Sequence, residues 1–350
     1  MNLFESVVEM GHEQVLFCHD KELNFKAIIA LHDTSLGRAM GATRLFPYAS
    51  EEDALRDVLR LSRGMTYKAA CANIPVGGGK AVIIANPQHK TDKMLRAYGR
   101  FVDSLQGRFI TGQDVNICPE DVQEMRRETK YVVGLSGRAG GPAPATALGV
   151  FLGIKAAVEF QLKTRELNGL KVAVQGLGNV GGHLCKYLHQ QGVKLFITDL
   201  NRERAEEIEK LYGATIVEPD KIYSLDVDIF APCAMGAILN SSTIPLIRAS
   251  IIAGCANNQL QDEQVHSTML RSQGILYCPD YVINSGGLIN VYSELTFIEE
   301  PQYLKQIHSI YDTLLEIFQK SKEENITTQD ASKRLAEERI MRAKNLKVAA

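Results

Sequence analysis

Short apolar runs alternate with amphipathic stretches along the first third of the chain. Residues 26–33 (KAIIALHD) and 81–86 (AVIIAN) are brief and apolar, which predicts two buried strands. Apolar positions recur every three to four residues over 51–71 and 92–105, which predicts two amphipathic helices. We expect a third strand over 108–115, where RFITGQDV contains a glycine turn. This part of the chain therefore combines strands with helices.

The second half of the chain alternates strand and helix more strictly. A helix expected over 145–161 precedes the apolar runs 170–176 and 193–199, and a helical pattern follows each of them. Three more short strands are expected at 228–232, 251–257 and 275–280. Strands that alternate with helices predict a parallel sheet covered on both faces.

A stretch rich in helix breakers separates the two halves. Five glycines and two prolines occur between Gly134 and Gly149, a composition typical of a hinge. We predict one domain over 1–134 and a second over 135–324, followed by a charged helix over 325–350 that could fold back on the first domain. The length of 350 residues agrees with two domains, since domains average about 150 residues.

Composition excludes several classes of protein. The 39 Lys and Arg balance 41 Asp and Glu without long runs of either sign, so we expect neither nucleic acid nor a membrane surface as a partner. The amino terminus is acidic where a signal peptide is basic, and no apolar run approaches the roughly 18 residues of a membrane span. Seven cysteines without a CxxC pair and eight histidines without ligand spacing predict free thiols, a cytoplasmic location and no metal site.

The motif GLGNVG, with Gly176, Gly178 and Gly181, directly follows an apolar strand and opens a helix. These glycines could serve only a tight turn, but their setting favours a dinucleotide site. There they allow the turn, the approach of pyrophosphate, and close packing of helix on strand. Asp199 ends the next strand, where a carboxylate binds ribose hydroxyls and repels a 2′-phosphate. NAD is thus favoured over NADP, although two arginines follow Asp199 closely.

A second group of candidate residues precedes the hinge. Lys68 ends a helix in MTYK, Lys80 follows three glycines, and Asp114 lies in TGQDV. The segment GGGK is no phosphate-binding P-loop, because Ile74 stands where that motif begins with glycine and Ala81 replaces its Ser or Thr. Glycines beside a lysine indicate instead that a ligand comes close to the backbone. Taken singly, each charged residue could also be a solvated surface group.

In order and spacing, MTYK, GGGKAVI, TGQDV, GLGNVG and PDYVINSGGLINV resemble the amino acid dehydrogenase family that includes the glutamate, leucine, phenylalanine and valine enzymes. The likeness covers almost the whole chain. It implies an α/β fold of two domains with a cleft between them: an amino-terminal dimerisation and substrate domain with a mixed sheet, and a doubly wound Rossmann domain that binds NAD. It also implies a homodimer or larger homo-oligomer.

The same resemblance implies roles for single residues. Lys68 would bind the substrate carboxylate, Lys80 would be the catalytic lysine, Asp114 its proton-transfer partner, and Asn284 would help to hold the substrate. Besides the three motif glycines and Asp199, the cofactor would be lined by Thr146, Asn179, Val180, Cys233, Ala234 and Asn257. The implied reaction converts an L-amino acid into a 2-oxo acid and ammonium. A catalytically silent NAD-binding regulator on the same fold is the alternative of another class.

The preferred substrate depends on fewer residues. Family members that use glutamate present a cation to its distal carboxylate, and the corresponding position, judged from the MGATR segment, is Met40, next to Gly41. On the helix after Asn284, the positions four, seven and eight residues on share one face; they are Leu288, Val291 and Tyr292. These apolar residues could be simple core, but a tyrosine and a methionine suit an aromatic substrate. We favour L-tryptophan, with phenylalanine or leucine as alternatives.

Overall fold

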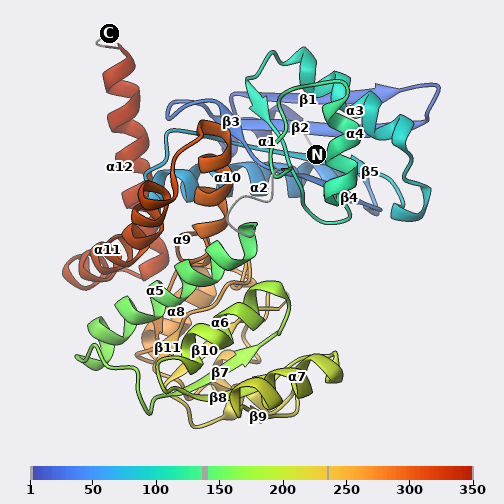
Figure 1. The fold of residues 1–350 in the computed structure, drawn as a ribbon. Helices are drawn as coiled ribbons and strands as arrows, with labels where there is room; N and C mark the ends of the chain where they lie inside the picture. The colour runs from blue at the N-terminus through green and yellow to red at the C-terminus, as the bar shows by residue number, and fades with distance from the viewer. Residues whose placement is uncertain (1–2, 136–140, 235, 349–350) are drawn as a thin grey trace. The chain divides into compact units, whose positions relative to one another are not determined.

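The computed structural model describes residues 3–135, 141–234 and 236–348 (Figure 1). The chain forms two compact units. Unit 1 comprises Met1–Arg138, Glu294–Phe297 and Ala336–Ala350, and unit 2 comprises Ala139–Ser293 and Ile298–Leu335. Part of the predicted hinge, residues 136–140, lies outside the described residues, so the boundary proposed after residue 134 stays a prediction.

Unit 1 is built on a mixed six-stranded sheet, as predicted. Its strand order is β1-β2-β5-β3-β6, with β4 also paired to β5. The strands are β1 (Gln14–Asp20), β2 (Phe25–Asp33), β3 (Ala39–Met40), β4 (Thr43–Phe46), β5 (Gly77–Ile84) and β6 (Phe109–Ile110). β2 runs antiparallel to β1 and β5, whereas β3 and β4 run parallel to β5. The strand expected over 108–115 is therefore much shorter than predicted, and β1 was not predicted.

Helices cover both faces of this sheet (Figure 1). Alternate residues of β2 point to opposite faces. Ile29 joins the core that contains Tyr98 of α3 (Asp92–Ser104), whereas Ile28 joins the core that contains Leu55 of α2 (Glu51–Cys71). α2 spans Glu51–Cys71, as its periodicity predicts, and Ser50 caps its first turn. The unit also contains α1 (Leu3–Glu9), α3 (Asp92–Ser104) and α4 (Pro119–Arg126).

The three glycines before Lys80 are the first three residues of β5, which begins earlier than the strand predicted over 81–86. Neighbouring groups pack directly against their backbone. A Cβ on Gly78 would lie 2.0 Å from the hydroxyl oxygen of Thr66, and one on Gly79 would lie 2.8 Å from the Phe109 ring. The glycines are thus needed for close packing of α2 and β6 against β5.

Unit 2 contains a six-stranded parallel sheet in the order β12-β11-β10-β7-β8-β9. Its strands are β7 (Lys171–Gln175), β8 (Lys194–Thr198), β9 (Thr215–Ile216), β10 (Ile229–Pro232), β11 (Ile251–Ile252) and β12 (Leu276–Tyr277). Strand order reverses between β7 and β10, which confirms the predicted doubly wound fold and marks its ligand-binding crevice. The helices that follow the strands are α6 (Asn179–His189), α7 (Arg202–Tyr212) and α8 (Glu263–Ser272).

The helix before this sheet, α5 (Pro142–Leu162), packs against α6 and against α11 (Glu300–Glu324). Among the described residues, α5 alone is long and apolar enough to cross a membrane by length and composition. Core helices of folded domains have the same character, and α5 buries residues such as Val150, Ile154 and Val158 inside unit 2.

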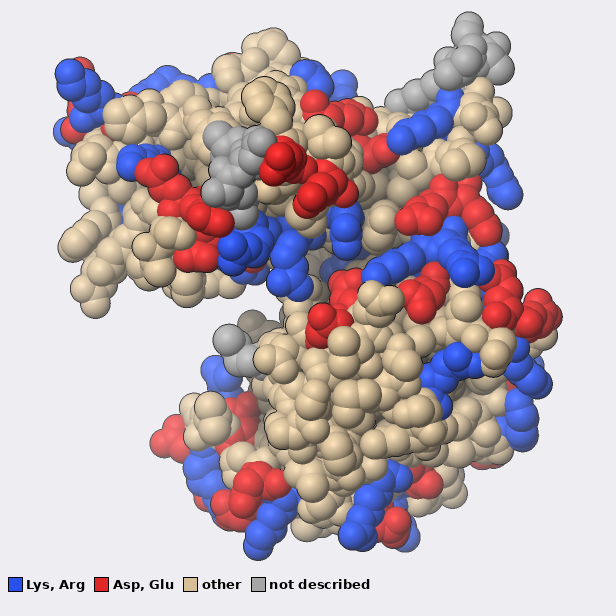
Figure 2. Space-filling model, turned by 180° about the vertical axis from the view of Figure 1, so that it is seen from behind, with Lys and Arg blue, Asp and Glu red and all other residues tan. Residues whose placement is uncertain are grey.

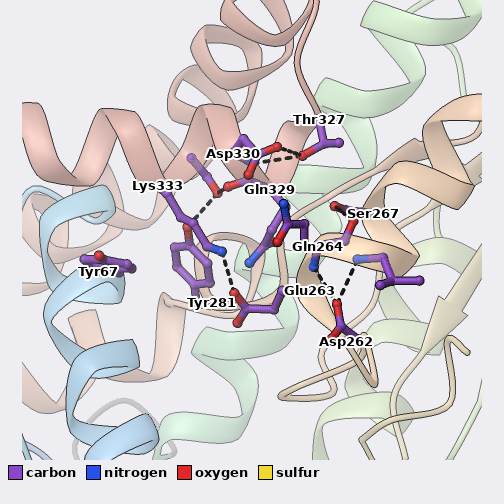
Figure 3. A network of polar contacts seen from close by, with 12 residues as sticks. Tyr67, Asp262, Glu263, Gln264, Ser267, Tyr281, Thr327, Gln329, Asp330 and Lys333 are labelled. Carbon is purple, nitrogen blue, oxygen red and sulfur yellow. Dashed lines mark hydrogen bonds and ion pairs between the residues drawn. The ribbon is translucent and has the colours of Figure 1, made fainter. Parts of the chain in front are cut away.

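The chain ends in four helices: α9 (Asp280–Ile283), α10 (Gly286–Thr296), α11 (Glu300–Glu324) and α12 (Thr328–Val348). The first turns of α12 belong to unit 2, where Lys333 pairs with Glu263 at 2.7 Å and Ser332 contacts the Tyr281 hydroxyl at 2.6 Å (Figure 3). From Ala336 onward α12 belongs to unit 1, where Lys344 pairs with Asp33 at 2.8 Å. One helix is therefore anchored by ion pairs in both units.

Candidate active site

Lys80 and Asp114 form a largely buried ion pair in unit 1. The ammonium nitrogen of Lys80 lies 2.6 Å from Oδ2 of Asp114, and the two side chains are 9% and 22% exposed. Lys80 is held by β5, where it pairs with Ala30 of β2. Asp114 follows β6, and the neighbouring Gln113 bridges to Thr43. Two residues singled out separately in the sequence thus meet in one site.

A second cation, which the sequence analysis missed, contacts the same carboxylate. Nε of Arg44 lies 3.4 Å from Asp114, while its Nη1 lies 2.9 Å from Asp57, which also accepts a hydrogen bond from the Tyr48 hydroxyl. Burial disfavours the charged form of Asp114, but the positive charges of Lys80 and Arg44 outweigh it and lower the pKa of Asp114. Asp114 is therefore an anion at neutral pH and can accept a proton.

Lys68 lies in the last turn of α2, the helix that packs directly on β5. Arg339 of α12 fixes this end of the helix, because its guanidinium donates to the carbonyls of Ala70 and Cys71 at 3.0 and 2.8 Å. A cation at the carboxyl end of a helix satisfies carbonyls that lack helical partners. Lys68 and Lys80 thus stand on elements in direct contact, and Arg339 is a further positioning residue that the sequence did not indicate.

Met40 and Gly41 lie at the end of β3, beside the glycines of β5. Met40 is 2% exposed and pairs with Gly78 and with Ile110. A Cβ on Gly41 would lie 1.7 Å from the Gly79 carbonyl oxygen, so only glycine fits this position. That Met40 faces the side chain of the substrate, as the resemblance implies, stays a prediction.

The three glycines of GLGNVG in unit 2 meet different surroundings. Gly176 has φ of +98°, and a Cβ there would lie 2.7 Å from Ala234. A Cβ on Gly181 would lie 2.1 Å from the Gly176 carbonyl oxygen, so helix α6 packs closely on the turn. Gly178 directly precedes Asn179 and Val180 of α6, and apart from its chain neighbours no atom of the described residues lies within 4 Å of the position that a Cβ on Gly178 would take. Open space before a helix amino terminus fits a pyrophosphate.

Asp199 follows β8 and ties the glycine-rich turn to the next loop. Its Oδ2 accepts a hydrogen bond from the backbone N–H of Leu177 at 2.6 Å, and its Oδ1 accepts one from Asn201 at 2.7 Å. Each carboxylate oxygen has two lone pairs, so Asp199 can still accept hydrogen bonds from ribose hydroxyls. The carboxylate therefore orients the turn in addition to the predicted ribose contact.

Asn284 and Asn257 are in contact in unit 2, and Thr146 lies against the helix that follows Asn284. Asn284 is buried and donates through Nδ2 to Asn257 Oδ1 at 2.6 Å and to the Cys255 carbonyl at 3.1 Å. The side-chain amide oxygen of Asn284, Oδ1, is buried and has no hydrogen-bond partner among the described residues. Such an oxygen could accept a hydrogen bond from an N–H group of a ligand. At the start of α10, a Cβ on Gly287 would lie 2.6 Å from the Thr146 hydroxyl, so α10 approaches the start of α5 closely.

The substrate-pocket residues predicted on α10 share one unit but differ in exposure. Leu288 is buried, whereas Val291 and Tyr292 are half-buried. Met40 belongs to unit 1 and these three to unit 2, so the pocket they were predicted to form stays a prediction.

Cys233 and Ala234, two residues predicted to line the cofactor, follow β10, at the reversal of strand order. No group of three His, Cys, Asp or Glu that could hold a metal occurs within the described ranges.

A doubly wound sheet with a glycine-rich dinucleotide turn, together with a buried Lys–Asp pair, defines a dinucleotide-dependent enzyme. The family profile described as Glu/Leu/Phe/Val dehydrogenase, dimerisation domain, matches residues 12–135, and that described as Glutamate/Leucine/Phenylalanine/Valine dehydrogenase matches 137–198 and 195–347. The chain belongs to this family of NAD(P)-dependent enzymes and is an amino acid dehydrogenase, an oxidoreductase.

Individual relatives extend over nearly the same length. The chain is 68% identical to an L-tryptophan dehydrogenase of Nostoc punctiforme over 99% of this chain and 98% of that protein. It is 48% identical to a leucine dehydrogenase of Bacillus cereus over 99% and 95%. The crystal structure of L-tryptophan dehydrogenase from Nostoc punctiforme matches with a TM-score of 0.88 and 67% identity, over 98% of this chain and 99% of that one.

Proposed function

We propose that this protein catalyses the reversible, NAD-dependent oxidative deamination of L-tryptophan to indole-3-pyruvate and ammonium. In balance, the amino acid, NAD and water give the 2-oxo acid, ammonium, NADH and a proton. The buried Lys80–Asp114 contact is the main observation that supports this reaction, because it joins two largely buried groups that can exchange a proton. High identity to an L-tryptophan dehydrogenase supports the choice of substrate.

The residues of unit 1 handle the amino acid. Lys68 binds the α-carboxylate, for which a fixed ammonium charge is suited. Lys80 first gives its ammonium proton to Asp114 and, as a neutral amine, takes a proton from the water that attacks the imine carbon of the substrate. Asp114 then passes the proton that it received to the departing amine, which returns both groups to their starting charges. Because Lys80 and Arg44 both stabilise its charge, Asp114 starts this step as a base. Met40 contributes an apolar surface for the side chain.

The residues of unit 2 hold the cofactor, and bound NAD supplies the acceptor for the hydride that leaves the α-carbon. Gly176, Gly178 and Gly181, with the amino end of α6, fit the pyrophosphate. Asp199 faces the adenosine ribose and disfavours a 2′-phosphate. The unpartnered carbonyl oxygen of Asn284 accepts a hydrogen bond from a ligand N–H.

Kinetics with a panel of amino acids test this proposal. NADH formation at 340 nm at alkaline pH should give the highest kcat/KM for tryptophan, followed by phenylalanine and leucine, and almost none for glutamate. A higher kcat/KM for leucine or phenylalanine would assign the protein to those substrates instead; its 48% identity to a leucine dehydrogenase is the observation in favour of leucine. Because the chain contains no tryptophan, indole fluorescence in a binding experiment comes from the ligand alone.

A silent NAD-binding regulator is the alternative of a different class. It would bind NAD without turnover of any amino acid in the same panel. The presence of Lys68, Lys80 and Asp114 in one unit, on contacting elements, favours the enzyme.

Assembly and location complete the proposal. A homodimer or larger homo-oligomer is supported by the match of residues 12–135 to a dimerisation domain. A reducing cytoplasm is supported by seven free cysteines. Light scattering on the purified protein would measure the number of subunits, and a monomer would contradict this part of the proposal.

A further inference from the structure

Two cysteine thiols face each other at the carboxyl edge of the parallel sheet in unit 2. Cys233 directly follows β10, and Cys255 follows β11 on the neighbouring chain segment. The strands pair Ile229 with Ile251 and Phe230 with Ile252, and this pairing ends before either cysteine. Beyond it the two side chains meet, because the Cys255 thiol forms a hydrogen bond to the Cys233 side chain.

Backbone contacts keep the two segments together beyond the strands. The Ala253 N–H donates to the Phe230 carbonyl at 3.0 Å, and the Ala256 N–H donates to the Pro232 carbonyl at 3.0 Å. These contacts lie on either side of Cys255, and the second ends at the residue before Cys233. The sulfur of Cys255 lies 3.8 Å from the Cys233 carbonyl oxygen. The Cys255 side chain therefore lies directly against Cys233, on the neighbouring segment at the edge of the sheet.

The two thiols are chemically different. A hydrogen bond from the Cys255 thiol lowers the pKa of Cys233 although burial opposes this. Donating that bond, together with burial, raises the pKa of Cys255. Thiolates are the nucleophiles in cysteine chemistry, so Cys233 is the attacking sulfur and Cys255 the resolving thiol. Both are half-buried, whereas four other cysteines are buried: Cys18, Cys71, Cys185 and Cys278.

The pair adjoins the dinucleotide turn and the predicted substrate residue Asn284. Cys233 precedes Ala234, against which the turn at Gly176 packs so closely that a Cβ there would come within 2.7 Å. The Cys255 carbonyl accepts the hydrogen bond from Asn284 at 3.1 Å. An S–S bond of about 2.05 Å replaces a looser thiol contact, so its formation draws the two loops together and displaces both contacts.

We propose that Cys233 and Cys255 form a reversible disulfide that weakens dinucleotide binding. The inference rests on the NAD site of the proposed function and not on the amino acid substrate. A peroxide oxidises the Cys233 thiolate to a sulfenic acid and leaves as water after its O–O bond breaks. The Cys255 thiol then attacks that sulfur, and a second water leaves as the S–S bond forms. In total, two thiols and one hydrogen peroxide give one disulfide and two waters, and a dithiol reverses the change.

Peptide mapping tests the covalent step without any measurement of activity. The full-length protein is treated with a small excess of hydrogen peroxide, its remaining thiols are alkylated, and the peptides are analysed by mass spectrometry. A cross-linked pair containing Cys233 and Cys255 is expected. In Cys255→Ser, the oxidation should stop at a sulfenic acid on Cys233, trapped by dimedone. Unlinked cysteines in the wild type under conditions that oxidise other thiols would overturn the proposal.

Calorimetric titration with NAD tests the functional consequence. Oxidation should weaken NAD binding about tenfold, a typical size for coupling between two sites, and dithiothreitol should restore it. Cys255→Ser should bind NAD as the reduced wild type does, and its NAD affinity should not fall tenfold after peroxide, because no disulfide can form. Cys118→Ser, which removes an exposed thiol of unit 1, is the matched control and should respond like the wild type. Equal NAD affinity before and after disulfide formation would contradict the proposal.

These readouts separate the two proposals. A disulfide that weakens NAD binding in a protein without amino acid turnover would contradict the proposed function and support this inference. Full turnover of tryptophan without a Cys233–Cys255 disulfide would support the proposed function and contradict this inference. Coupling is reciprocal at equilibrium, so NAD should also disfavour oxidation of the pair by the same factor of about ten, which is about 30 mV for two electrons.

Discussion

The ammonium of Lys80 lies 2.6 Å from the carboxylate of Asp114, with both side chains largely buried. A third group, Arg44, approaches the same oxygen at 3.4 Å. One anion between two cations remains charged at neutral pH, because each cation stabilises its ionised form. The arrangement keeps a proton donor and a proton acceptor in contact before the substrate binds. Acid–base catalysis at a single carbon requires both groups within hydrogen-bond reach.

Replacing Lys80 tests the catalytic half of this arrangement. Lys80→Ala should lower kcat by about 10³-fold, because a positioned proton-transfer group contributes roughly 10² to 10⁴. NAD affinity should be nearly unchanged, since the variant alters unit 1 alone. Steady-state kinetics and calorimetric titration measure the two quantities. Lys90→Ala, which removes another Lys–Asp pair of unit 1 at 2.5 Å, is the control and should keep near-normal turnover. Near-normal rates in Lys80→Ala would remove Lys80 from the mechanism.

Arg44 should set the acidic limb of the pH profile. Because its charge helps to lower the pKa of Asp114, Arg44→Gln should raise that pKa. The fall in kcat/KM at low pH should then begin about one unit higher, a usual effect of one nearby charge. Arg44→Lys keeps the charge and should shift the limb less.

The matched control for Arg44 is Arg96→Gln, which breaks a pair with Glu124 at 2.7 Å elsewhere in unit 1. Its pH profile should match the wild type. A profile of Arg44→Gln that superimposes on the wild type, with the melting temperature retained, would show that Arg44 does not tune Asp114.

Much of the fold could be predicted because its main elements have strong local patterns. The helix over 51–71 has the observed bounds of α2, and the apolar runs at 170–176 and 193–199 contain β7 and β8. The strand over 108–115 shrank to Phe109–Ile110, since Thr111 and Gln113 form only isolated bridges to other segments. β1 was missed because it is an edge strand whose apolar and polar residues do not alternate cleanly.

The sequence predicted single residues of the candidate site but not the contacts that join them to other residues. Lys80 and Asp114 stand in recognisable motifs, so the sequence indicated both. Arg44 lies 70 positions before Asp114, and no local pattern marks it as a partner. Arg339 is still further from the helix end that it caps. Contacts of this range depend on tertiary packing, which periodicity and spacing do not specify.

A buried histidine should make unit 1 sensitive to acid. Burial, together with the nearby charge of His32, lowers the pKa of His12 to about 3 from 6.5. In the unfolded chain the residue binds a proton below pH 6.5, and in the folded chain it does not. Stability is therefore complete above pH 6.5 and is lost as the pH falls toward 3. This residue alone should cost about 2 kcal/mol between pH 6.5 and 4.5.

Urea unfolding at the two pH values measures this loss. Acidic groups also contribute to it, so the informative quantity is the difference between the wild type and His12→Gln, which keeps a polar group near Ser62. The variant should lose about 2 kcal/mol less than the wild type. His19→Gln replaces an exposed histidine of unit 1 and should behave like the wild type. Equal losses in His12→Gln and the wild type would contradict the assignment.

Asp199 should decide between NAD and NADP. Asp199→Asn removes the charge that repels a 2′-phosphate but keeps a carbonyl oxygen for the Leu177 N–H, so the glycine-rich turn should stay in place. We expect NADP binding to strengthen and NAD binding to weaken, with the affinity ratio shifting about tenfold toward NADP, since close like charges cost at least about 1.4 kcal/mol. Calorimetric titration of both cofactors measures the ratio. Asp226→Asn, at an exposed acid of the same unit, is the control. An unchanged ratio in Asp199→Asn would place the ribose elsewhere.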